Sequence, residues 1–282
     1  MQEMATGYGL IEGPVWDKDK GLYFSDIPNG GVFLLAHDGS VSTALPKRRG
    51  VGGMALHAEG GIVMGGRDIS YVSLGDKPGQ RLLAPDAIPP AIGFNDLTTD
   101  RAGRIYVGSL AFMVFGGGEA KPGNLVRINL DGSHDVLSDG VMLTNGLGFS
   151  PDGKRLYHSD SRVGVRVYDV AADGTVGPWR LFADLGSGLP DGLKVAADGS
   201  VWVADAHGGR VAVFEPDGTH RMDVKTPLPM VTSLCFGGED LRDLYIVTGS
   251  ERGPHENCGT VFRTRVEVAG QPLAPARVRL NG

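Results

Sequence analysis

Residues 191–214 read DGLKVAADGSVWVADAHGGRVAVF, and this stretch decides the fold class. Three short apolar runs, at 191–195, 200–205 and 210–214, are separated by turns that contain Asp-Gly or Gly-Gly. Asp-Gly between runs rich in β-branched and aromatic residues is a strong hairpin signal. The stretch therefore predicts three consecutive antiparallel strands. Sustained helical periodicity is absent along the chain, so we expect almost no α-helix.

The same unit recurs along the chain. Short apolar runs begin directly after six key positions, which are spaced by 40, 43, 50, 46 and 41 residues. A repeat of this length built from short strands is typical of a β-propeller. Because the repetition is unbroken from position 12 to about 265, we expect residues 1–282 to form a single domain, an all-β six-bladed β-propeller. The key positions are Glu12, Gly52, Asn95, Asn145, Asp191 and Thr232.

Composition narrows the class of protein. The 282 residues include 45 glycines, which we assign mostly to turns between short strands. A net charge of -6 without a basic patch argues against nucleic acid as a partner. Two cysteines, Cys235 and Cys258, do not make a disulfide framework. No signal segment and no apolar run of roughly 20 residues is present, so we expect a cytoplasmic protein without a membrane partner, either a monomer or a small homo-oligomer.

Four of the six key positions carry a carboxylate or an amide. Equivalent positions of the blades converge on one axis, so we expect Glu12, Asn95, Asn145 and Asp191 to form a ring of oxygen donors. Each residue taken alone is better explained by a turn or by a solvated side chain than by a metal ligand. Two converging carboxylates, however, repel unless a cation lies between them. Mixed carboxylate and amide oxygens suit calcium, magnesium or manganese, and the ring therefore predicts a central metal site.

The key positions share one face of the predicted propeller with the loops that join the second and third strands of each blade. We call it the top face. The loop at 110–124 is the long one in the third repeat, and its apolar cluster over a polar ring predicts a mobile lid. A loop packed on a neighbouring blade or on a second subunit is the alternative. The cluster is Phe112, Met113, Val114 and Phe115, and a Gly triplet at 116–118 follows it.

In their order and spacing, several stretches resemble the senescence-marker-protein, gluconolactonase and luciferin-regenerating-enzyme-like family of six-bladed propellers. The resemblance covers nearly the whole chain. It implies a lactone hydrolase with one divalent metal held by Glu12, Asn145 and Asp191, and a further contact from Asn95 to the substrate. It leaves the ion open among calcium, zinc, manganese, magnesium and iron. The matching stretches are 12–16, 94–96, 145–153, 189–193, 208–211 and 232–238.

One departure from the family bears on the substrate. Sugar-lactone hydrolases of this family usually carry an Arg two residues before the substrate-binding Asn, and Gly93 stands there in this chain. An Arg offers bidentate hydrogen bonds to substrate oxygens, whereas Gly offers none. Together with the apolar lid, Gly93 favours a less polar lactone or ester over a sugar lactone. Arg67, Arg162 or His207 on the top face is the expected substitute if a sugar lactone is bound.

These observations predict a divalent-metal-dependent lactonase that acts on a small molecule, with calcium as the first choice of ion. We expect the metal to polarise the substrate carbonyl, Asp191 to serve as general base toward water, and Asn95 to orient the substrate or stabilise the oxyanion. A phosphotriesterase-like hydrolase that uses the same site and a non-catalytic metal-binding propeller scaffold are the alternatives. The expected substrate contacts are Asn95, Phe112, Met113, Phe115, Arg162 and His207.

Overall fold

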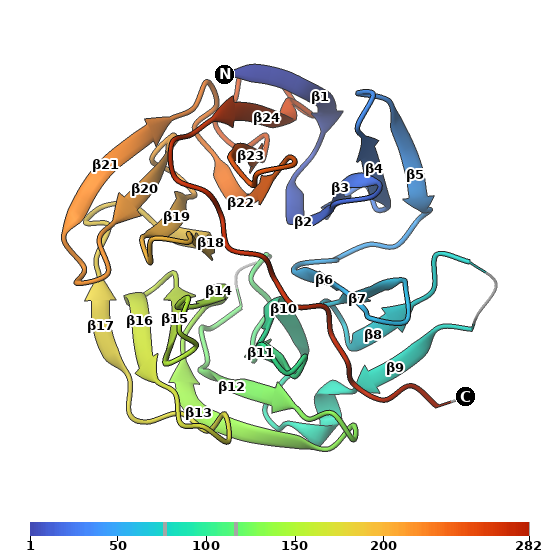
Figure 1. Cartoon of the computed structure of the whole chain (residues 1–282), viewed down its shortest axis with the longest axis vertical. Helices are drawn as coiled ribbons and strands as arrows, with labels where there is room; N and C mark the ends of the chain where they lie inside the picture. Colours follow the sequence, from blue (N-terminus) through green and yellow to red (C-terminus); the bar gives the residue numbers. More distant parts are fainter. Residues whose placement is uncertain (76–77, 116–117, 282) are drawn as a thin grey trace.

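Six four-stranded antiparallel sheets surround one axis in the computed structural model (Figure 1). The structure describes residues 1–75, 78–115 and 118–281. The predicted six-bladed β-propeller is therefore confirmed. Within these ranges the only helix is a single 3-10 turn at Pro85–Ala87. The same residues include no helix with the length and apolar character needed to cross a bilayer.

Each blade begins with its innermost strand and ends at the rim (Figure 1). Blades one and two are β2 (Ile11–Asp17), β3 (Gly21–Asp26), β4 (Val32–Ala36), β5 (Val41–Leu45), and β6 (Met54–Leu56), β7 (Ile62–Met64), β8 (Ile69–Val72), β9 (Gln80–Leu83). Blades three and four are β10 (Gly93–Thr99), β11 (Ile105–Leu110), β12 (Gly123–Ile128), β13 (His134–Val141), and β14 (Thr144–Phe149), β15 (Arg155–Asp160), β16 (Gly164–Asp169), β17 (Arg180–Ala183). Blades five and six are β18 (Pro190–Val195), β19 (Val201–Asp205), β20 (Arg210–Phe214), β21 (His220–Lys225), and β22 (Val231–Gly237), β23 (Asp243–Thr248), β24 (Gly259–Arg265), β1 (Gln2–Tyr8).

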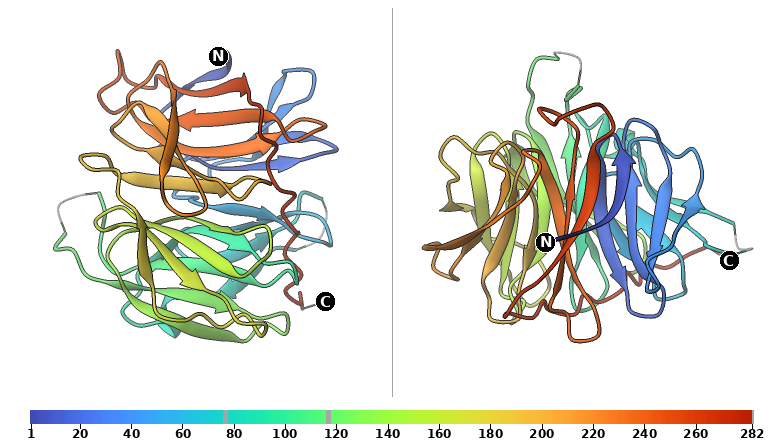
Figure 2. Two further views of the ribbon diagram at one scale, coloured as in Figure 1. Left: turned by 60° about the vertical axis from the view of Figure 1, so that its left-hand side comes forward. Right: turned by 90° about the horizontal axis from the view of Figure 1, so that it is seen from above.

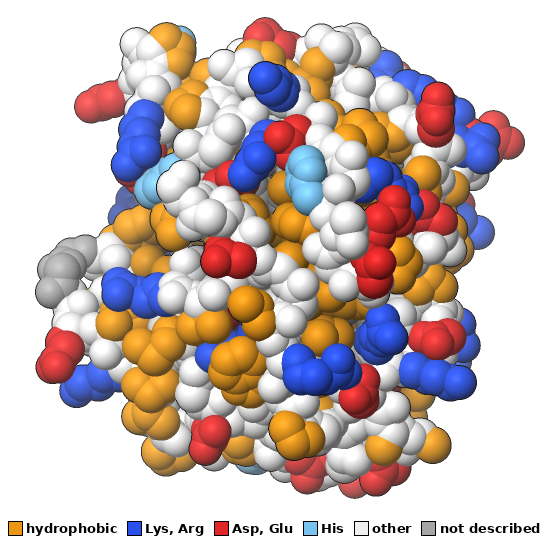
Figure 3. Space-filling view, turned by 90° about the vertical axis from the view of Figure 1, so that its left-hand side faces the viewer, with side chains coloured by type: hydrophobic (Ala, Val, Ile, Leu, Met, Phe, Trp, Pro, Cys, Tyr) orange, Lys and Arg blue, Asp and Glu red, His pale blue; other side chains and the backbone are white. Residues whose placement is uncertain are grey.

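The outer strand of each blade is the element that the apolar runs did not predict. Such a strand lies at the rim with one face in solvent, so its sequence is mixed and not continuously apolar. In β21, for example, exposed and partly buried residues alternate from His220 to Met222. Figure 3 shows apolar side chains exposed on the side of the molecule where β17 and β21 lie in Figure 1. The exposed large apolar residues include Leu181 of β17 and Trp179 in the preceding loop.

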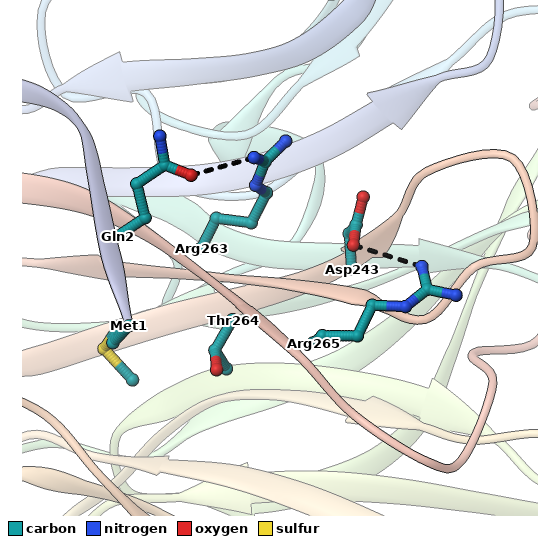
Figure 4. Close-up of a pocket in the computed structure, with 6 residues that line it drawn as sticks. All are labelled: Met1, Gln2, Asp243, Arg263, Thr264 and Arg265. Carbon is teal, nitrogen blue, oxygen red and sulfur yellow. Dashed lines mark hydrogen bonds and ion pairs between the residues drawn. The ribbon is translucent and has the colours of Figure 1, made fainter.

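The ring is closed by the N-terminal strand. β1 pairs with β24 and completes blade six, so the sheet edge that β24 would otherwise expose is covered. Figure 4 shows the outer side of this seam, where Arg263 donates a hydrogen bond to Gln2 Oε1 at 2.8 Å. A cavity of about 490 Å³ opens at the seam, and none of the expected site residues lines it.

The C-terminal segment, residues 266–281, crosses the face opposite the long loop of blade three (Figure 2). Its backbone is hydrogen-bonded to several blades. Ala269 O accepts from Ala197 of blade five, and Ala276 O accepts from Ala58 of blade two at 2.8 Å. Ala276 and Val278 are buried in the core that blades two and three share. The segment therefore ties together blades that are far apart in sequence.

Candidate metal and substrate site

The inner strands carry β-bulges at the predicted ring positions. In β10, Phe94 pairs with Ser109 and Leu97 pairs with Val107, so Asn95 and Asp96 together lie opposite one residue of β11. The same irregularity falls at the Asn145 position of β14 and at the Asp191 position of β18. A bulge re-aims side chains and increases the local twist. At the bulges, the side chains of the donor residues therefore do not follow the regular in-and-out alternation of a β-strand.

Glycine follows several ring positions because the inner strands crowd one another there. A Cβ at Gly146 would overlap the backbone nitrogen of Leu193, and a Cβ at Gly192 would overlap the hydroxyl of Ser233. The Asn-Gly and Asp-Gly pairs at 145–146 and 191–192 are thus not hairpin turns. They let adjacent blades approach closely enough for their donor residues to meet.

Three of the four predicted ring residues are linked by short contacts. Asn95 Nδ2 donates to Asn145 Oδ1 at 2.6 Å and to the carbonyl oxygen of Thr144 at 2.8 Å. The oxygen of the Asn145 amide also faces Asp191 Oδ1 at 2.9 Å. Two oxygen atoms at this distance require a shared proton or a cation, unless the amide turns by 180° and donates its own N–H.

Ser161 bears on which way the Asn145 amide points. Ser161 Oγ donates to the carbonyl oxygen of Pro190 at 2.6 Å and accepts from Asn145 Nδ2 at 2.7 Å. Because its proton goes to Pro190, the hydroxyl is left as an acceptor for the amide nitrogen. This relay directs the Asn145 oxygen toward Asp191. Ser161 was not predicted from the sequence, because a serine after a strand carries no distinctive signal.

Blade four anchors this part of the ring with a buried polar network. Thr144 Oγ1 lies 2.7 Å from His158 Nε2, and burial lowers the pKa of His158 to about 3, so the imidazole is neutral. The Asp160 carboxylate accepts from the backbone N–H of Met142 and of Leu143, at 2.8 and 3.0 Å. Arg166 is its ion-pair partner at 2.6 Å. The start of β14, and with it Asn145, is thereby held in place.

Glu12, the fourth predicted ring residue, is connected to the other acidic residues through charge repulsion. Glu12 and Asp191 are each only 8% exposed. Burial raises the pKa of Glu12 well above its ordinary value, and repulsion from Asp191 and then Asp96 adds to the shift. Burial likewise raises the pKa of Asp191 well above its ordinary value, with Asp96 the next contributor. The two predicted acidic residues therefore share one buried environment.

Asp96 and Lys194 belong to this environment and were not predicted. Asp96 is 7% exposed, and burial raises the pKa of its carboxyl while the positive charge of Lys194 opposes that shift. Lys194 also lowers the pKa of Glu12. A sequence signal existed for both residues. Asp96 replaces the glycine that follows the ring position in four other repeats, and Lys194 interrupts an apolar inner strand.

The predicted lid segment divides into a packed and an exposed part. Phe112 is buried, at 7% exposure, whereas Met113 and Phe115 are exposed at 64% and 66%. The guanidinium of Arg162 lies over the Phe112 ring, 5.6 Å from its centroid. Phe112 is therefore packed into the protein, whereas Met113 and Phe115 are the members of the predicted lid that face solvent. Positions 116 and 117 of the predicted Gly triplet lie outside the described residues.

His207 and Gly93 have different surroundings. His207 Nε2 lies 3.6 Å from Glu251 Oε1, so it links blade five to the long loop of blade six. Gly93 packs against blade two, where a Cβ would lie 3.0 Å from the carbonyl oxygen of Gly66 and 3.9 Å from Cα of Arg67. An arginine at position 93 would therefore require a small movement of that backbone.

The donor set fits a hard divalent ion. Across the described ranges no three His, Cys, Asp or Glu side chains gather in metal-binding geometry. The predicted ligands include only two carboxylates, and the third donor is an amide oxygen. Two buried carboxylates and one amide, with no imidazole or thiolate, match oxygen-preferring cations.

Residues 10–250 match the family described as the SMP-30/Gluconolactonase/LRE-like region. The chain belongs to this family. It is 36% identical over 280 residues to 6-deoxy-6-sulfogluconolactonase of Pseudomonas putida, covering 94% of each protein. It is 31% identical to pentonolactonase XacC of Haloferax volcanii, covering 98% of this chain and 97% of that one. A luciferin-regenerating enzyme has the same fold, with a TM-score of 0.84, 24% identity and coverage of 98% and 97%. The predicted resemblance is thus confirmed.

Proposed function

We propose that this chain is a divalent-metal-dependent lactonase. The observation that carries the proposal is the charge balance at the axis. The carboxylates of Glu12, Asp96 and Asp191 are buried and act on one another, and Lys194 is the cation that offsets them. When all of these groups are ionised, negative charge exceeds positive charge in a place that water screens poorly. A bound divalent cation restores the balance.

Glu12, Asn145 and Asp191 are the residues that we assign to hold the metal. The Asn145 oxygen already faces Asp191, and the relay from Ser161 to Pro190 supports that orientation. Calcium is our first choice because the donors are all oxygen atoms, with magnesium, manganese, zinc and iron as the alternatives. A metal held there would supply Lewis acidity toward a lactone carbonyl and would make a nearby water easier to deprotonate.

Asp191 and Asn95 have separate roles in the proposed hydrolysis. Asp191 would accept the proton of the attacking water, whose oxygen bonds to the carbonyl carbon. The ring carbon–oxygen bond then breaks, and the released alkoxide takes up a proton to give a hydroxy acid. Asn95 donates both amide N–H groups within the protein, so it can stabilise an oxyanion only by exchanging one of them. We therefore assign Asn95 first to holding Asn145 and second to orienting the substrate.

The substrate class follows from the family members and from this chain's own departures. The relatives are named for a sulfogluconolactone and for pentonolactones. Gly93 and the exposed Met113 and Phe115 favour a lactone with fewer hydroxyls. The names of the relatives and the apolar residues of this chain differ on the number of hydroxyls, but both are consistent with a lactone as the reacting group.

Metal removal and a substrate panel test the proposal. Protein stripped with a chelator should lose lactone hydrolysis and regain it with one added divalent ion. The panel comprises gluconolactone, xylonolactone, an alkyl lactone and a phosphotriester. If only the phosphotriester is cleaved, the phosphotriesterase alternative is correct. If the protein binds metal and cleaves none of the four substrates, the non-catalytic scaffold is correct.

A further inference from the structure

A cavity of about 620 Å³ lies on the top face between blades four and five. Its walls come from the loop after β15 and from the segment that leads into β18, and they include Ser161, Arg162, Asp184 and Pro190. Its volume is in the range of small-molecule sites. Because Ser161 and Pro190 form the relay to Asn145, the cavity wall is one hydrogen bond away from a proposed metal ligand.

Arg162 is the cationic side chain and Asp184 the acidic side chain among the residues that line this cavity, and Arg162 is exposed to solvent. The nearest acidic residue in sequence, Asp160, is already paired with Arg166. Asp184, which lines the same cavity, accepts a hydrogen bond from the backbone N–H of Gly186 at 2.9 Å. Arg162 itself forms no ion pair with any residue in the described ranges, and its guanidinium rests over the buried Phe112 ring. The aromatic contact holds the cation at the cavity, and among the described residues no side chain or carbonyl accepts a hydrogen bond from its guanidinium.

We propose that Arg162 binds an anionic substituent of the substrate, such as a carboxylate, sulfonate or phosphate, at the end remote from the lactone carbonyl. This inference rests on the proposed lactonase function. A guanidinium binds such groups through two parallel N–H donors, which gives both affinity and orientation. With the anion at Arg162, the other end of the molecule lies on the side of Asn145. The carboxylate of Asp184 also lines the cavity and repels an anion, so the anionic group is placed at Arg162 and away from Asp184.

A kinetic comparison tests the proposal with two lactones that differ only at carbon 6. The pair is gluconolactone and its 6-deoxy-6-sulfonate analogue, assayed with the metal-loaded protein. We expect Arg162→Gln to lower kcat/KM for the sulfonate about ten- to a hundredfold and to change kcat/KM for gluconolactone less than about threefold. Arg162→Lys should recover part of the loss. Arg180→Gln is the matched control, because Arg180 lies on the rim strand β17 in an exposed ion pair with Asp169 and does not line the cavity.

A binding measurement separates this proposal from the lactonase proposal. Calorimetry with 6-deoxy-6-sulfoglucose, against glucose, compares one anionic and one neutral sugar and needs no turnover. Tighter binding of the sulfonate that Arg162→Gln removes, and that rising salt weakens, supports the anion site even when neither lactone is hydrolysed. Equal losses on the sulfonate and the neutral sugar in Arg162→Gln, or equal effects of Arg180→Gln and Arg162→Gln, would overturn it.

Discussion

At the scale of single residues, the charges around the axis govern what the site binds. Glu12, Asp96 and Asp191 come from three different blades and are each less than 10% exposed. Such carboxylates stay ionised only if a cation or hydrogen-bond donors compensate them. Lys194 offsets them in part. Metal affinity and its dependence on pH are therefore set by these few side chains.

Removing one carboxylate ligand should abolish tight metal binding. We expect Asp191→Asn and Glu12→Gln each to weaken divalent-ion binding by more than about a hundredfold, since a direct ligand contributes more than an outer partner. Calorimetric titration of chelator-treated protein measures the effect. Asp152→Asn, at an exposed turn, is the control and should bind as wild type. Unchanged affinity in both ligand variants would show that the site is assigned wrongly.

Ser161 offers a test of orientation alone. Ser161→Ala removes the acceptor for Asn145 Nδ2, so the amide is free to turn and donate to Asp191. We expect metal affinity to fall about ten- to a hundredfold, as is usual for partners of a metal ligand. Thermal unfolding of the metal-free protein should change little by comparison. Wild-type affinity in this variant would show that the relay does not position Asn145.

The raised carboxyl pKa values fix the sign of a pH effect. Glu12, Asp96 and Asp191 have pKa values above their ordinary range near about 4. A raised pKa in the folded state stabilises the metal-free protein at low pH, and this contribution is lost as pH rises through the folded values. Metal binding needs the ionised forms, so it strengthens over the same interval.

We therefore expect added calcium to raise the unfolding temperature more at pH 8 than at pH 5. Differential scanning fluorimetry of wild type and Asp191→Asn measures the difference, and the variant should show little calcium effect at either pH. A larger calcium effect at pH 5 would contradict the assignment of these carboxylates to the metal.

At the scale of elements, the inner-strand bulges and the long blade-three loop shape the site. The bulges set Asn95, Asn145 and Asp191 toward one another. The loop contributes the buried ring of Phe112 and, after it, the exposed apolar residues Met113 and Phe115. Packing and substrate contact are thus assigned to different residues of one loop.

The two phenylalanines should respond differently to truncation. Phe112→Ala should lower the free energy of unfolding by about 2–4 kcal/mol, because it removes a buried ring that supports Arg162. Phe115→Ala should leave stability within about 0.5 kcal/mol and should raise KM for apolar lactones. Denaturant unfolding and steady-state kinetics measure the two effects. Equal stability losses would show that the whole segment is packing and not a lid.

At the scale of the whole molecule, the chain ends hold the ring together. The N-terminal strand completes blade six, and the C-terminal segment crosses the face opposite the lid loop (Figure 2). Ala276 and Val278 fill the core of blades two and three from that segment. Stability therefore depends on contacts that join distant parts of the sequence.

Deleting residues 270–282 should lower the unfolding temperature by at least about 5 °C. The deletion exposes the apolar surface that Val278 and Ala276 cover and leaves backbone groups such as the N–H of Ala58 without partners. Deleting only residues 280–282 is the control and should lower the unfolding temperature far less. If both deletions unfold at the wild-type temperature, the segment does not contribute to closing the propeller.

The sequence by itself determined the six-bladed propeller, the ring positions and the long loop of blade three. It could do so because strand alternation, turn residues and a repeat of 40–50 residues are local properties of the chain. The outer strands, the C-terminal crossing, the roles of Asp96, Lys194 and Ser161, and the burial of Phe112 were decided by the tertiary structure. Each depends on which blades become neighbours, and neither burial nor Coulomb interaction between residues more than 40 positions apart is encoded in a local pattern.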